Sequence, residues 1–275
     1  MKNPKDIGLT LLKHIFLVFY ALLALIPFLW VLMSAFKDNT GIFTQPFALP
    51  KSFELTNIIS VWNAGNINVF FSNSLFVGFI TLSLQLLFVS MATYFLVRVA
   101  RVPLLSNYFL LGLMMPIQAM LIPNFLTIRS LNLMNSLWGV IMVYCATNTA
   151  FAIFLLSGYM RSIPHELEEA ATIDGAGYVR IFFMIILPVS KPGLATVATF
   201  SFLHAWNELL FAMVILTRRA KMTLTQGINF LRGEYVTDYG LLCAGLLFAI
   251  IPVVIMYILL QEQVIKGMTA GAVKG

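Results

Sequence analysis

The chain has 275 residues, of which 60% are hydrophobic and only 10% are charged. Soluble domains carry roughly 25% charged residues, so this composition excludes a protein whose whole surface faces water. The formal net charge of +6 does not indicate a nucleic-acid partner, because the basic residues lie in short clusters between apolar segments rather than in one basic stripe. We therefore expect an all-α integral membrane protein.

Six segments are apolar enough and long enough to cross a bilayer, for which a helix needs about 20 residues. The first follows three lysines, as a signal peptide would, but its apolar part is longer than that of a signal peptide and no small-residue cleavage site follows. We therefore expect it to be retained in a single transmembrane domain over residues 1–275. The expected spans are 14–36, 70–95, 104–127, 136–158, 190–217 and 239–261, with a tail over 262–275.

An even number of spans places both termini on one side of the membrane. If both termini are cytoplasmic, the inner segments carry ten Lys and Arg residues and the outer segments carry seven, of the 17 in the chain. The positive-inside rule favours this orientation. The bias is small, and the basic cluster from Arg218 to Arg232, which would then lie outside, counts against it.

Polar residues within the expected spans are candidates for a translocation path or gate, because they are costly to expose to lipid. Asn73 lies in the second span and Asn148 in the fourth. The third span contains Pro116, Gln118 and Pro123. Its prolines free backbone carbonyls that need partners in protein or water, so we expect a kinked helix beside the pore. For each of these residues, ordinary packing between helices is the alternative.

The segment between the fourth and fifth spans, 161–188, is long and has helical features. Pro164 suits a first helical turn, and acidic residues follow where a helix N-terminus favours them, namely Glu166, Glu168 and Glu169. Gly175 breaks this pattern, since glycine readily adopts left-handed conformations. A second short helix should follow, with an apolar face of Val179, Phe182, Phe183 and Ile186. We expect a helix–turn–helix on the cytoplasmic membrane surface; these features leave open whether it only rests on the bilayer.

The fifth span contains Glu208, the one carboxylate well inside a predicted span. Its insertion costs about 2.5–3.5 kcal/mol, so it should face protein or water. His204 lies four residues earlier and therefore on the same helix face, and Asn207 is adjacent. Either Asn207 and Glu208 line the path or gate, or they form a hydrogen bond between helices that holds two subunits together.

The segment from Glu169 to Pro188 resembles the EAA loop, the signature of permease subunits of binding-protein-dependent ABC importers. The matching residues are Glu169, Ala170, Ala171, Gly175, Ile185, Leu187 and Pro188, with three residues before Gly175 and nine after it. The resemblance implies that this loop, with Asp174 at its turn, is a coupling helix seated in a groove on a cytoplasmic ATPase subunit. Glu169 would pair with a basic residue there, and Gly175 would permit the sharp turn.

Nearly the whole chain resembles the carbohydrate-uptake branch of that family, and within it the second, six-span permease subunit of the maltose-transporter type. The similar segments are Pro27, the stretch ending at Pro50, Asn73-Ser74, Trp206-Asn207-Glu208 and the tail 267–275. This resemblance implies a sugar, oligosaccharide, polyol or sugar phosphate as cargo. It also implies a homologous permease partner, a cytoplasmic ATP-binding subunit dimer, an external solute-binding protein and a bacterial or archaeal cytoplasmic membrane.

The same resemblance implies two further contact regions. The tail, through Thr269, Gly271 and Lys274, would reach the ATPase subunit. The outer loop 218–238 would reach the solute-binding protein through Phe230, Arg232, Gly233 and Glu234. A solvated connector is the alternative for the outer loop.

The sequence indicates no enzyme, metal or cofactor. It contains no GxxxxGK[ST] phosphate loop and no Gly-Lys pair, so we expect ATP hydrolysis in a separate subunit. Its histidines are scattered, whereas metal sites need clustered ligands. The alternatives are an ion-coupled secondary transporter, for which only Glu208 could serve as a coupling site, and an assembly subunit without a pore.

Overall fold

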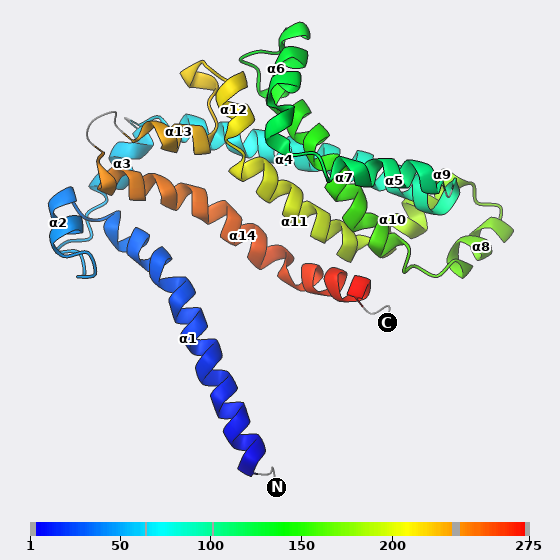
Figure 1. The fold of residues 1–275 in the computed structure, drawn as a ribbon, viewed down its shortest axis with the longest axis horizontal. Coiled ribbons are helices and arrows are strands. Elements are labelled where there is room, and N and C mark those ends of the chain that lie inside the picture. Colours follow the sequence, from blue (N-terminus) through cyan, green and yellow to red (C-terminus); the bar gives the residue numbers. More distant parts are fainter. Residues whose placement is uncertain (1–3, 64, 101, 233–236, 273–275) are drawn as a thin grey trace. The chain divides into compact units, whose positions relative to one another are not determined.

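The computed structural model describes residues 4–63, 65–100, 102–232 and 237–272, and every regular element among them is a helix (Figure 1). Four helices are long and apolar enough to cross a membrane, and up to six segments are if each of two bent helix pairs forms one span. The four long helices cover Leu9–Ser34, Ile67–Val99, Leu137–Met160 and Tyr239–Ile265. The prediction of an all-α membrane protein is confirmed.

The chain divides into two compact units, each described here by itself. The first unit combines Met1–Asn68 with Gly227–Ile250, and the second combines Val69–Gln226 with Ile251–Gly275. The first unit contains α1 (Pro4–Ser34), α2 (Asn39–Thr44), α3 (Thr56–Asn63) and the beginning of α14 (Tyr239–Ala272). The apolar side chains of α1 are exposed almost throughout, from Leu9 to Leu32, as is expected of a helix that faces lipid.

Polar side chains hold the segment after α1 in place. The Asn57 amide donates to the backbone oxygens of Ala35 and Lys37, each at 3.0 Å. The buried Lys37 ammonium donates in turn to the backbone oxygens of Gln45 and Pro46. These bonds satisfy carbonyls just beyond the end of α1 and at the end of α2, where no helical N–H is available. Lys37, one of the seven Lys and Arg residues counted in the outer segments, is therefore a structural residue.

The second unit contains α14 from Ile251 on and the remaining helices, with α13 (Leu224–Phe230) divided between the two units at Gly227. They are α4 (Ile67–Tyr94) with the π-helix η1 (Phe95–Val99), α5 (Pro103–Gly112), η2 (Ile117–Met120), α6 (Leu121–Ser130), α7 (Leu137–Met160), α8 (Glu166–Ile173), α9 (Tyr178–Ile181), the π-helix η3 (Phe182–Ile186), α10 (Leu187–Val189), α11 (Lys191–Asn207), α12 (Leu210–Ile215), η4 (Arg219–Lys221) and α13 (Leu224–Phe230).

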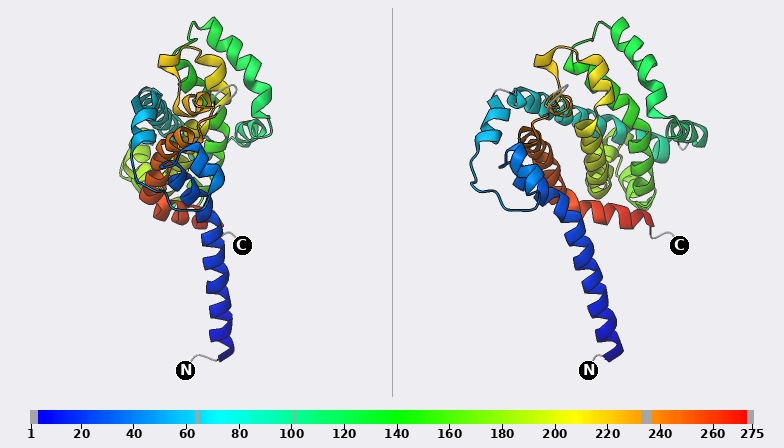
Figure 2. Two further views of the ribbon diagram at one scale, coloured as in Figure 1. Left: turned by 90° about the vertical axis from the view of Figure 1, so that its left-hand side faces the viewer. Right: turned by 60° about the vertical axis from the view of Figure 1, so that its left-hand side comes forward.

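Helices α7 and α11 lie side by side and form the centre of the second unit (Figure 2). Their contact uses small residues on α11, since Gly193, Ala195, Ala198 and Ser201 are all buried. A methyl group added at Gly193 would lie 2.6 Å from Cγ of Tyr159. Small residues allow helix backbones to approach closely in a membrane, where packing drives helix association.

The predicted third span, 104–127, is not one continuous helix. Helix α5 ends at Gly112, and the helix that follows, Ile117–Ser130, lies at 91° to it. Pro116 stands at the break and precedes η2, because it has no N–H to continue the α5 ladder. Pro123 lies in the first turn of α6, where a missing N–H costs nothing, and so produces no second kink.

The predicted fifth span, 190–217, is also interrupted. Helix α11 ends at Asn207, Glu208 is extended with φ −69° and ψ 128°, and α12 begins at Leu210. At its other end, α11 is bent by 77° from the preceding helical segment, Tyr178–Val189. The apolar run predicted the location of the helix, and the polar residues within it determine where the helix breaks.

Replacing Gly193 by alanine is expected to destabilise the α7–α11 contact by about 1–3 kcal/mol, because the new methyl group would overlap the Tyr159 ring. The thermal midpoint of the purified protein in detergent measures this. Gly158→Ala is the matched control: a methyl group there would meet no atom within 4 Å, so its midpoint should be equal or slightly higher. Equal midpoints for the two variants would contradict this packing.

Candidate functional site

The loop between α7 and α11 contains the residues that the sequence marks most strongly. Its first helix, α8, begins at Glu166 after the N-cap His165, and Pro164 lies before the cap rather than in the first turn as predicted. The three predicted acidic residues do occupy the first turn, where the positive end of the helix dipole favours them. The carbonyls of Ile163 and Pro164, just before this helix, accept hydrogen bonds from Arg98.

Arg98 is a buried cation that anchors this loop. Its Nε donates to both carboxylate oxygens of Glu168, at 3.1 and 3.2 Å. Its Nη1 and Nη2 donate to the carbonyls of Ile163 at 2.9 Å and Pro164 at 3.3 Å, with that of Met160 at 3.4 Å. Its side chain is only 1% exposed. A cation in such a place requires a partner for its charge and its donors, and the planar guanidinium can bond several acceptors at once.

Three helices therefore meet at one side chain. Arg98 belongs to the π-helix that continues α4, its carbonyl partners are the last residue of α7 and two residues of the segment that follows it, and its carboxylate partner lies in α8. A cation is favourable at the C-terminus of α7, where carbonyls lack helical partners. In the sequence, Arg98 counted only as one of the ten Lys and Arg residues of the inner segments. The available signals were an arginine that ends a long uncharged run and an acidic cluster after the fourth span.

Helix α8 ends in the left-handed turn that the sequence predicts. Gly175 has a φ of +79°, in the region that favours glycine. The Ala176 N–H donates to the Ala171 carbonyl at 2.9 Å and the Gly175 N–H donates to the Thr172 carbonyl at 3.0 Å. This is the Schellman pattern of helix termination. Since an added methyl group at Gly175 would meet no atom, the backbone conformation and not a lack of space requires glycine there.

The apolar face predicted for the second short helix is partly wrong. Ile181, Phe182 and Ile186 are buried, whereas Val179 and Phe183 are exposed. The π-helix η3 accounts for Phe183, because its wider turn changes the side-chain period from Phe182 on. Val179 precedes η3, and Ile181 is the buried residue of its helix instead. Pro188 follows directly and lacks the N–H that an α-helix would need there.

The residues of the loop motif lie on three short helices. Ala170, Ala171 and Glu169 belong to α8, and Glu169 and Ala170 are exposed on it together with Asp174 at its end. Ile185 and Leu187 are half-buried in η3 and α10, and Pro188 is exposed beside them. The tip of the loop also exposes apolar side chains, of which Ile173 is 87% exposed.

Glu208 is satisfied within its own chain. Its carboxylate accepts from the backbone N–H groups of Phe211 at 2.9 Å and Ala212 at 3.3 Å. Its carbonyl accepts from the hydroxyls of Tyr144 and Thr225. The acid therefore caps α12 at the positive end of its dipole, a role that the sequence analysis did not consider. The usual cap is Ser, Thr, Asp or Asn at the N-cap itself, whereas Glu208 acts from the position before the N-cap Leu209, so the sequence offered only the general preference for acids at helix N-termini.

Asn73 and Ser74 hold the outer loop against α4. The Asn73 amide donates to the carbonyls of Ala220 at 3.1 Å and Met222 at 2.9 Å, and the Ser74 hydroxyl accepts from the Leu224 N–H at 2.7 Å. Both residues bond backbone groups of the loop between α12 and α13. This polar pair within an apolar helix therefore has a structural explanation, because it gives those backbone groups hydrogen-bond partners.

The other candidate path residues are also spread over the second unit. Asn148 is buried and its amide donates to the Ser201 hydroxyl at 2.8 Å, between α7 and α11. Gln118 is exposed in η2 at the bend after α5, and Asn207 is exposed at the end of α11. The structure does not bring the five candidates together in one site.

The two contact regions implied for partners are described in part. Phe230 and Arg232 are exposed at and just beyond the end of α13, whereas Gly233 and Glu234 lie outside the described residues. Helix α14 continues through Thr269 and Gly271 instead of ending at 261, and Lys274 lies outside the described residues. Among the described residues there is no group of three His, Cys, Asp or Glu that could hold a metal ion.

Comparisons with known proteins all match this chain to components of transport systems. Residues 89–269 match the family described as binding-protein-dependent transport system inner membrane component. The chain is 35% identical, over 94% of its length and 87% of the relative's, to the diacetylchitobiose uptake system permease protein NgcG of Streptomyces coelicolor. It is 33% identical, over the whole of both chains, to the arabinooligosaccharides transport system permease protein AraQ of Halalkalibacterium halodurans. The fold is similar, with a TM-score of 0.82 and 23% identity over 95% of this chain and 98% of the other, to a chain of a bacterial ABC transporter involved in the import of the acidic polysaccharide alginate.

Replacing Arg98 by alanine is expected to destabilise the second unit by about 3–5 kcal/mol, because the half-buried Glu168 carboxylate would lose its cation. The thermal midpoint should fall, and trypsin should cut faster at Arg161 as the loop loosens. The exposed Arg180 supplies the control: its replacement by alanine should change stability by no more than about 0.5 kcal/mol. Loss of equal size in both variants would refute an anchoring role for Arg98.

Proposed function

The chain belongs to the family of inner membrane components of binding-protein-dependent transport systems, and on that basis we propose that it forms half of the translocation pathway of an ATP-driven importer. It is a multi-pass inner membrane permease subunit, and ATP is hydrolysed in a separate subunit. Membership also implies an ATPase and a binding protein as partners. We propose that a homologous permease subunit supplies the other half of the pathway, and that a dimer of ATPase subunits drives both.

The exposed tip of the α8 loop is the observation that carries this proposal. Ile173 exposes most of its apolar surface on α8, outside the candidate spans, and Tyr178 and Val179 are exposed where the next helix begins; such patches are typical of protein contact sites. Glu169 is exposed on the same short helix. We propose that α8 enters a groove on the ATPase subunit, where Glu169 pairs with a basic residue and Asp174 and Gly175 form the turn.

The anchor at Arg98 explains how motion of that contact could reach the membrane. A free loop would absorb a displacement, whereas the Arg98–Glu168 pair fixes α8 to the ends of α4 and α7. Ile185, Leu187 and Pro188 then connect the loop to α11. In the proposed mechanism, closure of the ATPase subunits moves α8, the anchored helices move with it as rigid bodies, and access to the pathway alternates between the two sides.

This mechanism requires the loop and both termini to lie in the cytoplasm, as the charge distribution favours. Within the pathway, we propose Gln118 and Asn207 as the candidates to face the cargo, since both are exposed at breaks in apolar helices. Asn73, Asn148 and Glu208 would support the pathway from behind through the contacts they make in this chain. The tail and the loop 218–238 keep their proposed contacts with the ATPase subunit and the binding protein.

We propose a sugar or oligosaccharide as the cargo, with a polyol or sugar phosphate as a related possibility. The relatives that carry this proposal are named for diacetylchitobiose and arabinooligosaccharides. The ion-coupled and assembly-subunit alternatives lose their support. Family membership implies that ATP is the energy source. The Glu208 carboxylate, which an ion-coupled transporter would need as a coupling site, caps α12 instead.

Ile173→Asp tests the docking of α8. Because Ile173 is 87% exposed, the substitution should leave the permease folded but place a charge in the contact, and co-purification of the ATPase subunit should fall about 10- to 100-fold. Leu49→Asp is the matched control, because Leu49 is 74% exposed on a different loop and its variant should retain the ATPase subunit. Full retention and normal transport in the Ile173 variant would overturn the proposal.

Glu208 can be tested with two substitutions. Glutamine keeps an oxygen that can accept from the Phe211 N–H, so uptake and substrate range should change by no more than about twofold if the residue acts as a cap. Alanine removes the cap and should lower stability by about 1 kcal/mol, seen as a lower thermal midpoint. If glutamine abolishes uptake while stability is unchanged, the carboxylate has a direct role in the pathway.

A further inference from the structure

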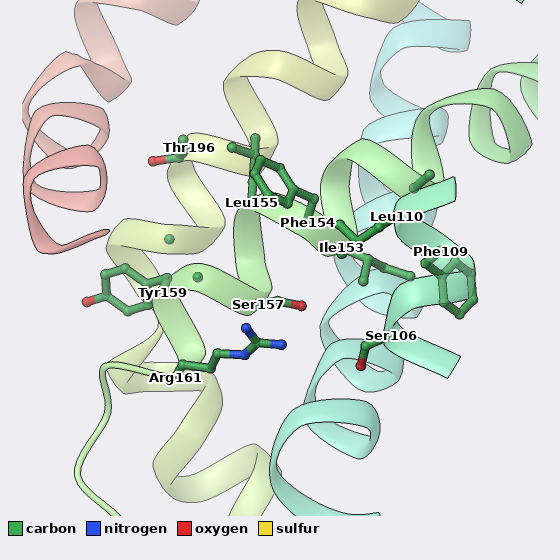
Figure 3. A pocket seen from close by; sticks show the side chains of 13 residues that line it. Ser106, Phe109, Leu110, Ile153, Phe154, Leu155, Ser157, Tyr159, Arg161 and Thr196 are labelled. Atoms are coloured by element: carbon green, nitrogen blue, oxygen red, sulfur yellow. The ribbon is translucent and has the colours of Figure 1, made fainter. Parts of the chain in front are cut away.

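Helices α5, α7 and α11 enclose a groove in the second unit with a volume of about 350 Å³. Its walls are largely apolar, with Phe109 and Leu110 from α5 and Ile153 and Phe154 from α7. Figure 3 shows these side chains in the upper right part of the view, with the polar residues Ser106, Ser157 and Arg161 below them. The groove therefore has an apolar part and a polar end.

The polar end of the groove continues into a second hollow of about 320 Å³, which shares Ser106 and Arg161 and adds Asn107 and His165. Arg161 thus lies where the two hollows meet. Its side chain is exposed, and within the part of the chain that the structure describes its guanidinium forms no ion pair. Arg98, by contrast, is buried and fully engaged. The positive charge at the mouth of the groove is left for a ligand.

The position of this charge along the helices indicates the ligand. Arg161 follows the last residue of α7, and Ser106 lies in the first turn of α5. Under the orientation proposed above, on which this inference rests, both lie at the cytoplasmic surface, at the depth of lipid headgroups. Anionic lipids give that surface its negative potential, and basic pockets between transmembrane helices on the cytoplasmic side are suited to their headgroups.

We propose that this groove binds an anionic phospholipid of the cytoplasmic leaflet. An acyl chain lies against Phe109, Leu110 and Phe154, and the phosphate accepts hydrogen bonds from Arg161 and the neighbouring hydroxyls. Charge complementarity favours this lipid as the occupant, since the exposed Arg161 matches the headgroup phosphate and the apolar wall beside it matches an acyl chain. The lipid would stiffen the contact between α5 and α7 beside the anchored loop.

The test uses the full transporter complex in nanodiscs of phosphatidylcholine with a minor fraction of phosphatidylglycerol, and native mass spectrometry to count the lipids retained on the released complex. Arg161→Gln should lower retained phosphatidylglycerol about fivefold and leave phosphatidylcholine unchanged. Arg180→Gln removes an equal charge outside the groove and should retain the lipid. Gly158→Leu keeps the charge but extends into the groove, where an added Cβ has open space, and should also lower retention.

Three results would overturn the inference. Unchanged phosphatidylglycerol in the Arg161 variant, or equal loss of both lipids, would exclude recognition of the headgroup charge. Dissociation of the permease pair in the Gly158 variant would show that a second subunit covers the groove. Substrate-stimulated ATP hydrolysis is measured on the same wild-type complex: its absence would count against the proposed function, whereas unchanged lipid retention in an active complex would count against the lipid site alone.

Discussion

The contact between Arg98 and Glu168, in which one N–H group is shared by both carboxylate oxygens, is the constraint on which the arrangement of the α8 loop depends. A buried arginine is tolerated only where its charge and its donors are met, so the ends of α4, α7 and α8 are required to converge on it. Removing either charge would leave the other without compensation. The loop is therefore part of the folded second unit, although its sequence is more polar than the spans on either side of it.

The same requirement, that each polar group have a partner, explains the other departures from straight helices. At the end of α11, Glu208 supplies acceptors to the first amides of α12. On α4, Asn73 and Ser74 bond the backbone of the loop that precedes α13. Irregular backbone at membrane depth is tolerated only where protein or water satisfies it. The break at Glu208 therefore lies where a polar side chain is within reach of the freed backbone groups, whereas the bend after α5 lies at Pro116.

The long helices could be predicted from the sequence because lipid imposes both a length and an apolar composition on them. Gly175 could be predicted because the left-handed conformation favours one residue type. The anchor could not, because Arg98 and Glu168 are 70 residues apart and no local pattern joins them. The π-helix η3 was missed for a related reason: its wider turn follows from Pro188 and from packing of Phe182, and a 3.6-residue period cannot represent it.

Polar residues of the second unit fall into two classes, those whose hydrogen bonds are made within the unit and those whose charge is exposed. Arg98, Asn148 and Glu208 are consumed by contacts within the second unit, and such residues define a shape. Glu169 and Arg161 are exposed at the polar ends of the helices, beside apolar surface that the described chain does not cover. A charge next to uncovered apolar surface is suited to an amphipathic or oppositely charged partner. In the proposed coupling to an ATPase subunit, the second class supplies the contact residues, and the first class holds those residues in fixed positions.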